Sequence, residues 1–164
     1  MKNILLIGCG HMGGSLMSGW SNSKNYTISV IDKKKYAILK KRNRNKIIKF
    51  FKSINDINDQ NNFDFIIFAT RPLELTNVFK ELKNVNFNKK SIAISVIAGK
   101  KTEIFKNNLL NINKIVRVMP NMPALIGEGV HCIYANKSIN KKEINEIDKL
   151  FSLSGKTLFF NSEI

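Results

Sequence analysis

Short apolar runs alternate along the chain with amphipathic segments, and this alternation is the main structural signal in the sequence. The runs have the length of strands, and most are apolar throughout, which is typical of a sheet covered on both faces. They predict strands over residues 3–7, 26–31, 47–51, 63–69, 91–97, 114–119, 129–135 and 157–160. The intervening segments predict helices near residues 12–22, 34–44, 73–82 and 102–110, with a last helix after residue 140.

The last helix has a start signal of its own. Asn140 and Glu143 have the spacing of a capping box, in which each side chain binds the other residue's backbone N–H. One helical face then carries the apolar residues Ile144, Ile147, Leu150 and Phe151. The helix over residues 73–82 has a similar face, formed by Leu75, Val78, Phe79 and Leu82.

Strands that alternate with helices imply parallel pairing and right-handed crossovers. The sequence therefore predicts an α/β fold, a doubly wound Rossmann-type sheet that is mostly parallel and has helices on both faces. We expect one dinucleotide-binding domain over residues 1–164, with no internal repeat and no long linker. The polar stretch at residues 55–62 is the best candidate for a mobile loop.

The first strand runs into a glycine pattern, Gly8-x-Gly10-x-x-Gly13, at the start of the first helix. In such a turn the first glycine permits the bend, the second lets a pyrophosphate approach the backbone, and the third lets the helix pack closely on the strand. Asp32 ends the second strand, at about the distance expected of an acid that binds a ribose. This context favours a dinucleotide site, and the alternative is a glycine-rich turn without a ligand.

Turn-forming and polar residues follow several of the expected strands. They occur at residues 8–13, 32–33, 69–72, 98–99 and 119–121. Each is a plausible plain turn, but the carboxyl ends of parallel strands meet at one edge of the sheet, where ligands bind. Together they indicate one continuous site.

The positive charge is unusual for this class of protein. The net charge is +15, and the segment from Lys33 to Lys52 holds ten Lys or Arg residues and no acid. Three interpretations compete: a solvated helix face, attraction of a nucleotide 2′-phosphate near Lys33, Lys34 and Lys35, and a nucleic-acid surface. Lys and Asn are abundant throughout the chain, and aromatic residues do not interleave with the basic run in an RNA-stacking pattern, so nucleic acid is the least favoured partner.

Composition and cysteine spacing indicate which broad classes of protein the chain does not resemble. A hydrophobic content of 43% is ordinary for a globular protein. No apolar run approaches the ~18–20 residues that span a bilayer, and the apolar start is too short for a signal peptide. Cys9 and Cys132 show neither metal-ligand nor disulfide spacing. We therefore expect a cytoplasmic protein with no membrane partner and no metal.

A second informative stretch runs from Arg117 to Ala124, Arg-Val-Met-Pro-Asn-Met-Pro-Ala. Pro120 and Pro123 each fix a φ angle and remove a backbone donor, so the loop between them is stiff. It carries Asn121, whose amide can donate and accept hydrogen bonds. Such a loop suits the positioning of a nicotinamide ring or a small substrate, and the alternative is a structural turn.

These motifs together resemble pyrroline-5-carboxylate reductase. The resemblance is carried by Ile7–Gly13, Ala69–Pro72, Ser95–Gly99, Arg117–Ala124 and Gly127–Gly129, which stand in the family's order and approximate spacing. It covers essentially the whole chain but only the amino-terminal half of the family. It implies hydride transfer from NADPH or NADH to the C=N carbon of 1-pyrroline-5-carboxylate, giving proline. The alternatives are a non-catalytic NAD(P)-binding module and another NAD(P)-dependent dehydrogenase of the β-hydroxyacid type.

The resemblance also implies roles for individual residues. Asn121 would orient the nicotinamide and the incoming ring without acting as an acid or base. The implied cofactor-binding residues are Gly8, Cys9, Gly10, His11, Met12, Gly13, Asp32, Lys33, Asn55, Ala69, Thr70, Arg71, Pro72, Ala98, Gly99 and Asn121. A protonated imine is already electrophilic, so orientation can supply much of the acceleration, and the hydride chemistry belongs to the cofactor.

The chain departs from the family at several points, among them Met122, where the family usually has Thr, and His11, where it usually has Asn. Arg71 stands where the family usually has Lys, which keeps the charge but adds a bulkier planar group. The family's helical domain, which makes the dimer and supplies much of the substrate site, is absent from this chain. We therefore expect a homo-oligomer, and full activity toward the small-molecule substrate, only where that helical part is present.

Overall fold

The computed structural model of the protein describes residues 1–43, 46–59 and 62–163. Its strands are β1 (Lys2–Ile7), β2 (Tyr26–Ile31), β3 (Ile48–Phe51), β4 (Phe65–Phe68), β5 (Ile92–Ser95), β6 (Ile115–Met119), β7 (Gly129–Ala135) and β8 (Gly155–Phe160). Its α-helices are α1 (His11–Ser21), α2 (Tyr36–Arg42), α3 (Leu75–Leu82), α4 (Thr102–Asn108) and α5 (Lys141–Phe151). Two short 3₁₀ helices are η1 (Ile54–Asp56) and η2 (Met122–Ile126). None of the helices in these ranges is long and apolar enough to cross a membrane.

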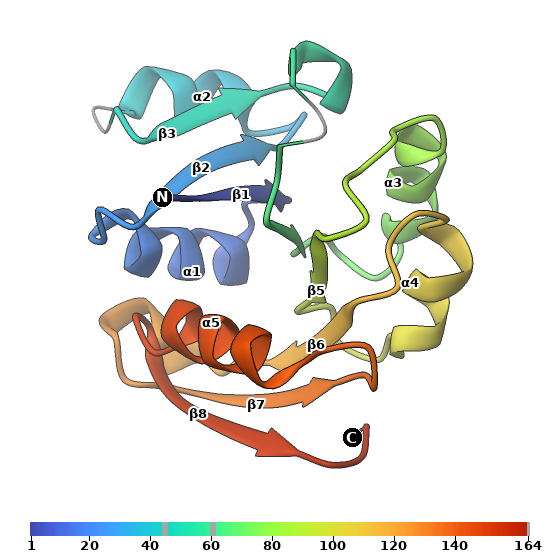
Figure 1. Cartoon of the computed structure of the whole chain (residues 1–164). Coiled ribbons are helices and arrows are strands. Elements are labelled where there is room, and N and C mark those ends of the chain that lie inside the picture. The colour runs from blue at the N-terminus through green and yellow to red at the C-terminus, as the bar shows by residue number, and fades with distance from the viewer. Residues whose placement is uncertain (44–45, 60–61, 164) are drawn as a thin grey trace.

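The described strands form one sheet in the order β3-β2-β1-β4-β5-β6-β7-β8 (Figure 1). Strands β1 to β6 are parallel to one another, in agreement with the α/β sheet predicted from the sequence. The chain runs outward from β1 toward β3 and then crosses to β4 on the other side of β1. This reversal is the topological switch point at which open α/β sheets bind ligands.

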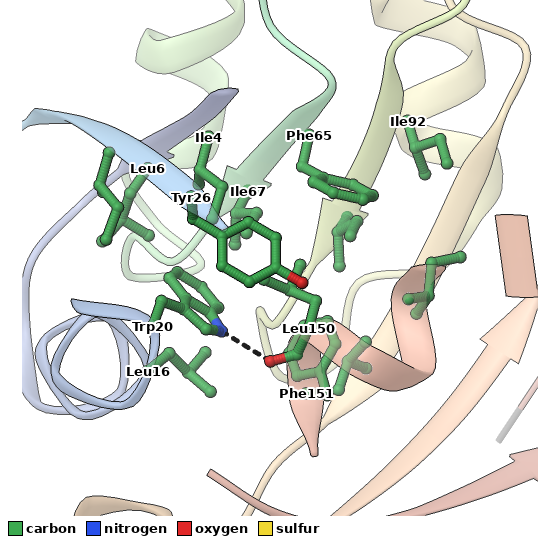
Figure 2. Close-up of a cluster of buried hydrophobic side chains, with 14 of the residues drawn as sticks. Ile4, Leu6, Leu16, Trp20, Tyr26, Phe65, Ile67, Ile92, Leu150 and Phe151 are labelled. Atoms are coloured by element: carbon green, nitrogen blue, oxygen red, sulfur yellow. Dashed lines mark hydrogen bonds between the residues drawn. The ribbon is translucent and has the colours of Figure 1, made fainter. Parts of the chain in front are cut away.

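One face of the sheet packs on α1 and α5. Trp20 of α1 is fully buried, and its indole N–H donates to the carbonyl oxygen of Leu150 in α5 at 3.1 Å (Figure 2). The Trp20 ring meets Phe151 edge to face, with 6.1 Å between the centroids. Because these contacts join residues at least 130 positions apart, they fix α5 beside the first helix and close the fold around β1.

The opposite face packs on α3 and α4. Its centre is an aromatic cluster of Phe68 from β4, Phe79 from α3 and Phe105 from α4, with centroid separations of 5.1 to 6.1 Å. On α3 the residues Leu75, Phe79 and Leu82 are buried, as the helical period of that segment predicts. Both faces of β1 and β4 are therefore covered, which explains their almost uninterrupted apolar sequence.

The element boundaries agree with the sequence pattern within a few residues. The capping box at α5 is confirmed, since the Asn140 side chain accepts from the N–H of Glu143 and the Glu143 carboxylate accepts from the N–H of Asn140. The basic helix expected over residues 34–44 is α2, and its expected last residue lies outside the described residues. Part of the candidate mobile loop forms η1, and residues 60–61 of that loop also lie outside the described ranges.

The pairing of β7 differs from the parallel pairing that alternating strands and helices imply. β7 runs antiparallel to β6, while β8 is parallel to β7. Only η2 and a few flanking residues connect β6 to β7, which is too short for the crossover that a parallel pair requires. The sheet is therefore mostly parallel, with the last two strands reversed.

A buried histidine lies between these reversed strands and α5. His131 of β7 is fully buried, its Nε2 lies 3.0 Å from the hydroxyl oxygen of Ser154, and its ring meets Phe151 edge to face. Its Nδ1 is buried and has no hydrogen-bond partner within the described ranges. Burial lowers the pKa of His131 below its usual 6.5, because the imidazolium would lose its hydration.

Acidification is therefore expected to destabilise the fold before the carboxylates titrate. Below pH 6.5 the unfolded chain binds a proton at His131 while the folded chain resists it, so stability is complete above that pH and falls as the pH falls. Urea unfolding between about pH 7.5 and 5.5 should show a declining free energy. The decline should persist in His11→Asn and flatten in His131→Gln, and an unchanged free energy across this interval would contradict the assignment.

Candidate functional site

A polar cavity of about 560 Å³ lies at the carboxyl ends of β1, β2 and β4, at the switch point of the sheet. Its lining residues come from residues 8–13, here called the glycine loop, and from the loops after β2 and β4. They are Gly8, Gly10, His11, Met12, Asp32, Lys34, Lys35, Ala69, Thr70, Arg71 and Glu74. Eight of these eleven belong to the predicted cofactor-binding set, so the fold brings half of the sixteen predicted residues together in one cavity wall.

The three glycines of the loop occupy three different environments. Gly8 has φ +95°, and a Cβ there would lie 2.8 Å from the carbonyl oxygen of Ala69. A Cβ on Gly13 would lie 2.3 Å from the carbonyl oxygen of Gly8, so the helix approaches the strand as closely as backbone permits. A Cβ on Gly10 would meet nothing within 4 Å. The space in front of Gly10 is therefore a cradle that a side chain would fill.

The first helix directs its amino-terminal end at this cradle. Gly10 is the N-cap, no side chain caps the helix, and its first turn has no acidic residue. The first backbone N–H groups of a helix lack partners within it, and the helix dipole adds a partial positive charge at that end. An uncapped helix start behind a glycine with open space in front of it suits a phosphate group.

Thr70, a second polar residue, also lines this cavity. It follows β4, and its hydroxyl oxygen is buried without a hydrogen-bond partner in the part of the chain that the structure describes. Thr70 also lines an adjoining cavity of about 300 Å³. Buried hydroxyls are nearly always hydrogen-bonded in folded proteins, so this one indicates a site for a bound polar group.

Asp32 lies at the end of β2 as predicted, and it also holds the glycine loop. One carboxylate oxygen accepts from the N–H of Cys9 at 2.8 Å, and the other accepts from the N–H of Lys35 at 2.9 Å. The Lys35 ammonium group donates to the carbonyl oxygen of Cys9 at 3.0 Å. Since each carboxylate oxygen can accept two hydrogen bonds, Asp32 can fix the loop and still accept a ribose hydroxyl.

Charges of both signs surround the outer part of the site. Lys34 and Glu74 form an ion pair of 2.5 Å that joins the loop after β2 to the start of α3. The hydrogen bond from Lys34 lowers the pKa of Glu74 below its usual 4.5. Lys33 lines the adjoining 300 Å³ cavity, whose other charged or amide side chains include Asp32, Lys34, Lys52, Glu74, Asn77 and Glu81. Nothing in the sequence near Glu74 distinguishes it from a surface acid, so its place at the site appears only in the structure.

The thiol of Cys9 is expected to be unreactive. Cys9 is a buried residue of the glycine loop, and burial, with a smaller contribution from Asp32, raises its pKa to about 11. The nucleophilic thiolate is therefore scarce at neutral pH. Labelling the folded protein with a maleimide should leave Cys9 unmodified while the half-buried Cys132 reacts, and both should react in denaturant. Rapid labelling of Cys9 in the folded protein would show that the loop opens.

A third cavity, of about 250 Å³, lies at the carboxyl ends of β5 and β6. Its lining residues are Met12, Val96, Ile97, Ala98, Arg117, Val118, Met119 and Pro120. Met12 belongs to both this cavity and the one at the glycine loop, so the two are adjacent. Two adjacent cavities, one with many polar residues and one with a mostly apolar lining, suit the two ends of a dinucleotide.

Asn121 follows Pro120, a lining residue of this third cavity, and is the N-cap of η2. Its side-chain oxygen accepts from the N–H of Val130 at 2.9 Å, which ties the proline-flanked loop to β7. The NH₂ group is then the polar part of this amide that could contact a ligand. The predicted orienting role of Asn121 stays a prediction.

Not every predicted residue lies in a cavity wall. Six of the predicted residues are absent from the linings of the three cavities described above: Cys9, Gly13, Asn55, Pro72, Gly99 and Asn121. Asn55 is exposed in η1, where its N–H binds the Ser53 hydroxyl. The cofactor-binding roles of all the predicted residues, inside and outside the cavity walls, stay predictions. Among the described residues, no cluster of three or more His, Cys, Asp or Glu could hold a metal ion.

Comparisons with known proteins agree with this geometry. Residues 3–99 match the family model described as NADP oxidoreductase coenzyme F420-dependent. A pyrroline-5-carboxylate reductase of Haemophilus influenzae is 31% identical over 120 residues, covering 70% of this chain and 44% of that protein. Another, from Aquifex aeolicus, is 34% identical over 98 residues, covering 60% of this chain and 35% of that protein. The chain thus spans less than half the length of the curated relatives it matches first.

Solved structures show the same fold. The pyrroline-5-carboxylate reductase of Coxiella burnetii superimposes with a TM-score of 0.82 at 24% identity, covering 99% of this chain and 60% of that one. A Plasmodium falciparum pyrroline carboxylate reductase with NADP bound gives a TM-score of 0.73 at 23% identity, with 98% and 58% covered. The resemblance inferred from the motifs is confirmed. Because the family model matches more than half of its residues, this chain belongs to the family described as NADP oxidoreductase coenzyme F420-dependent, and within it the chain is similar to pyrroline-5-carboxylate reductases.

Proposed function

We propose that the chain forms the cofactor-binding half of a pyrroline-5-carboxylate reductase, which reduces 1-pyrroline-5-carboxylate to L-proline with NADPH or NADH. The observation that carries the proposal is the open space in front of Gly10, at the uncapped start of α1. That cradle has the chemistry of a pyrophosphate site. The similarity to reductases of this activity, and the stretch Arg117–Ala124, support the choice of reaction.

The residues of the first cavity would hold the adenosine and pyrophosphate part of the dinucleotide. Backbone N–H groups at the start of α1 would donate to the pyrophosphate. The orphaned hydroxyl of Thr70 would find its missing partner on the ligand. Asp32 would accept from a ribose hydroxyl, and Lys33, beside it in the adjoining cavity, would supply positive charge toward a 2′-phosphate.

The third cavity would hold the nicotinamide. Met12, Ala98 and Pro120 would form an apolar wall that excludes water from the ring, and Asn121 would orient it through its NH₂ group. The bound dinucleotide supplies the hydride for the C=N carbon of the substrate. The described residues near this cavity need not provide a strong acid, because a protonated imine is already electrophilic. Holding the cofactor and the substrate in the reactive orientation can lower the activation barrier by up to ~7–11 kcal/mol.

We infer that the grip on the substrate carboxylate comes from a further, helical part of the protein. The chain spans 44% of its Haemophilus influenzae relative, which leaves room for such a part. Dimer contacts would come from the same region. The alternatives are a module that binds NAD(P)H without activity and another dehydrogenase of similar fold, such as the prephenate dehydrogenase of Aquifex aeolicus, which superimposes with a TM-score of 0.75 at 16% identity.

A cofactor titration followed by addition of substrate tests these possibilities in order. The chain is expected to enhance or shift the fluorescence of NADPH or NADH in a saturable way. Adding pyrroline-5-carboxylate to the protein with its helical part should then deplete the reduced cofactor and yield proline. Saturable binding without turnover in that protein would favour the non-catalytic module. Absence of binding to either cofactor would refute the proposed function.

A further inference from the structure

Arg117 is a buried cation beside the third cavity. It lies near the end of β6 and is only 9% exposed. In the sheet it pairs with Ser95 of β5 on one side and with Tyr134 of β7 on the other. A buried guanidinium needs an anionic or hydrogen-bonding partner, because its hydration has been lost.

Glu163, in the segment after β8, provides an anionic partner. One carboxylate oxygen lies 3.5 Å from a terminal nitrogen of Arg117. The same oxygen accepts from the backbone N–H of Thr102 at 2.7 Å, and the other accepts from the Thr102 hydroxyl at 3.0 Å. Both charged side chains are largely shielded, with 10% and 17% of their surfaces exposed. This carboxylate therefore links β6 to the first residue of α4.

The contacts of Glu163 hold one end of the loop that forms part of the wall of the third cavity. Residues 96–101 connect β5 to α4 and include Val96, Ile97 and Ala98 of the lining. The first end of the loop is held by the sheet, since the N–H of Val96 donates to the carbonyl oxygen of Phe68 at 3.0 Å. The second end begins α4 at Thr102, where Glu163 binds both the backbone and the side chain. The position of the wall thus depends on two anchors.

We propose that Glu163 is a positioning residue for the nicotinamide end of the site. It acts through Thr102 and Arg117, holding loop 96–101 at the distance from Met12 that leaves the 250 Å³ cavity open. This inference rests on the proposed function, since it assigns the cavity to a nicotinamide ring. The adenosine and pyrophosphate part of the site contains neither Glu163 nor its two partners.

Because Glu163 is assigned to the nicotinamide end of the site alone, its replacement should weaken binding of the whole dinucleotide but not of its adenosine half. Glu163→Gln keeps acceptor capacity for Thr102 but removes the negative charge beside Arg117. We expect it to weaken binding of the intact reduced dinucleotide roughly tenfold, as for loss of one charge-assisted contact. Binding of the adenosine half alone should change by less than about twofold, measured with 2′,5′-ADP where NADPH is the cofactor and with ADP where it is NADH. The fluorescence of the bound nicotinamide should also shift toward that of the free cofactor.

Two further variants separate positioning from general destabilisation. Glu103→Gln makes the same charge change at an exposed residue in the first turn of α4, and it should bind both ligands as the wild type does. Thr102→Val removes one of the two hydrogen bonds to Glu163 and should weaken dinucleotide binding in the same direction, but less. Hydrogen exchange at the amides of loop 96–101, measured without ligand, should accelerate in Glu163→Gln and stay unchanged in Glu103→Gln.

The outcomes are distinguishable. Wild-type affinity and wild-type exchange in Glu163→Gln would overturn the positioning role, as would an equal loss of affinity for the dinucleotide and its adenosine half. If the wild-type chain binds no nicotinamide dinucleotide, the proposed function fails, and the positioning role toward the ring falls with it. In that case the exchange experiment would still report whether Glu163 anchors the loop.

Discussion

Replacing Gly10 with valine is expected to abolish dinucleotide binding while leaving the fold intact. Apart from its chain neighbours, a Cβ at this position meets no protein atom within 4 Å, and the backbone is extended, with φ −71°, so the conformation accepts a side chain without backbone strain. The valine methyl groups would occupy the space in front of the uncapped helix start. A pyrophosphate could then no longer reach the N–H groups of α1.

The expected loss of affinity is at least about a hundredfold, because the phosphate contacts are lost together. Stability should fall by no more than about 1 kcal/mol, since valine is a poorer N-cap than glycine. Titration of NADPH and NADH fluorescence and thermal unfolding of the same samples measure both quantities. Gly14→Ala is the matched control: its new Cβ would lie 4.0 Å from the Cys9 sulfur, Gly14 does not line the cavity at the glycine loop, and the variant should bind normally. Wild-type affinity in Gly10→Val would place the phosphate site elsewhere.

The parts of this molecule that could be predicted from sequence are those with local signals. The apolar run of β1 and the three glycines after it lie within twelve residues, and each glycine has the environment that the motif predicts. The capping box of α5 is equally local, because two side chains three positions apart satisfy each other's backbone. Such features depend on chain stereochemistry more than on the rest of the fold.

The remaining features depend on residues far apart in the sequence. Asp32 was expected to bind a ribose, but its hydrogen bond to Cys9, 23 positions away, also makes it a support of the glycine loop. Glu163 binds Thr102 across 61 positions, and nothing in its immediate neighbourhood distinguishes it from a surface acid. The reversal of β7 similarly follows from the shortness of the connection through η2. Sequence patterns thus predict where the site lies, while the long-range contacts that hold its loops in place are seen only in the structure.

Two adjacent glycines in α1 should respond oppositely to alanine. At Gly13 the added Cβ would lie 2.3 Å from the carbonyl oxygen of Gly8 and 3.1 Å from the Cβ of Ala69, so α1 must move away from β1. At Gly14 the nearest atom is 4.0 Å away, and alanine is the better helix former. We expect Gly13→Ala to lose about 3 kcal/mol or more of unfolding free energy. Gly14→Ala should gain about 0.5–1 kcal/mol.

Thermal and urea unfolding of the two variants measure this contrast. For a chain of this size the losses and gains correspond to roughly 2–4 °C in Tm per kcal/mol. Movement of α1 also displaces the N–H groups that face the phosphate cradle, so Gly13→Ala should bind the dinucleotide more weakly even where it remains folded. Equal stability of the two variants would mean that α1 is not packed closely against the end of β1. The N–H groups at the start of α1 would then not be held in a fixed position for a phosphate.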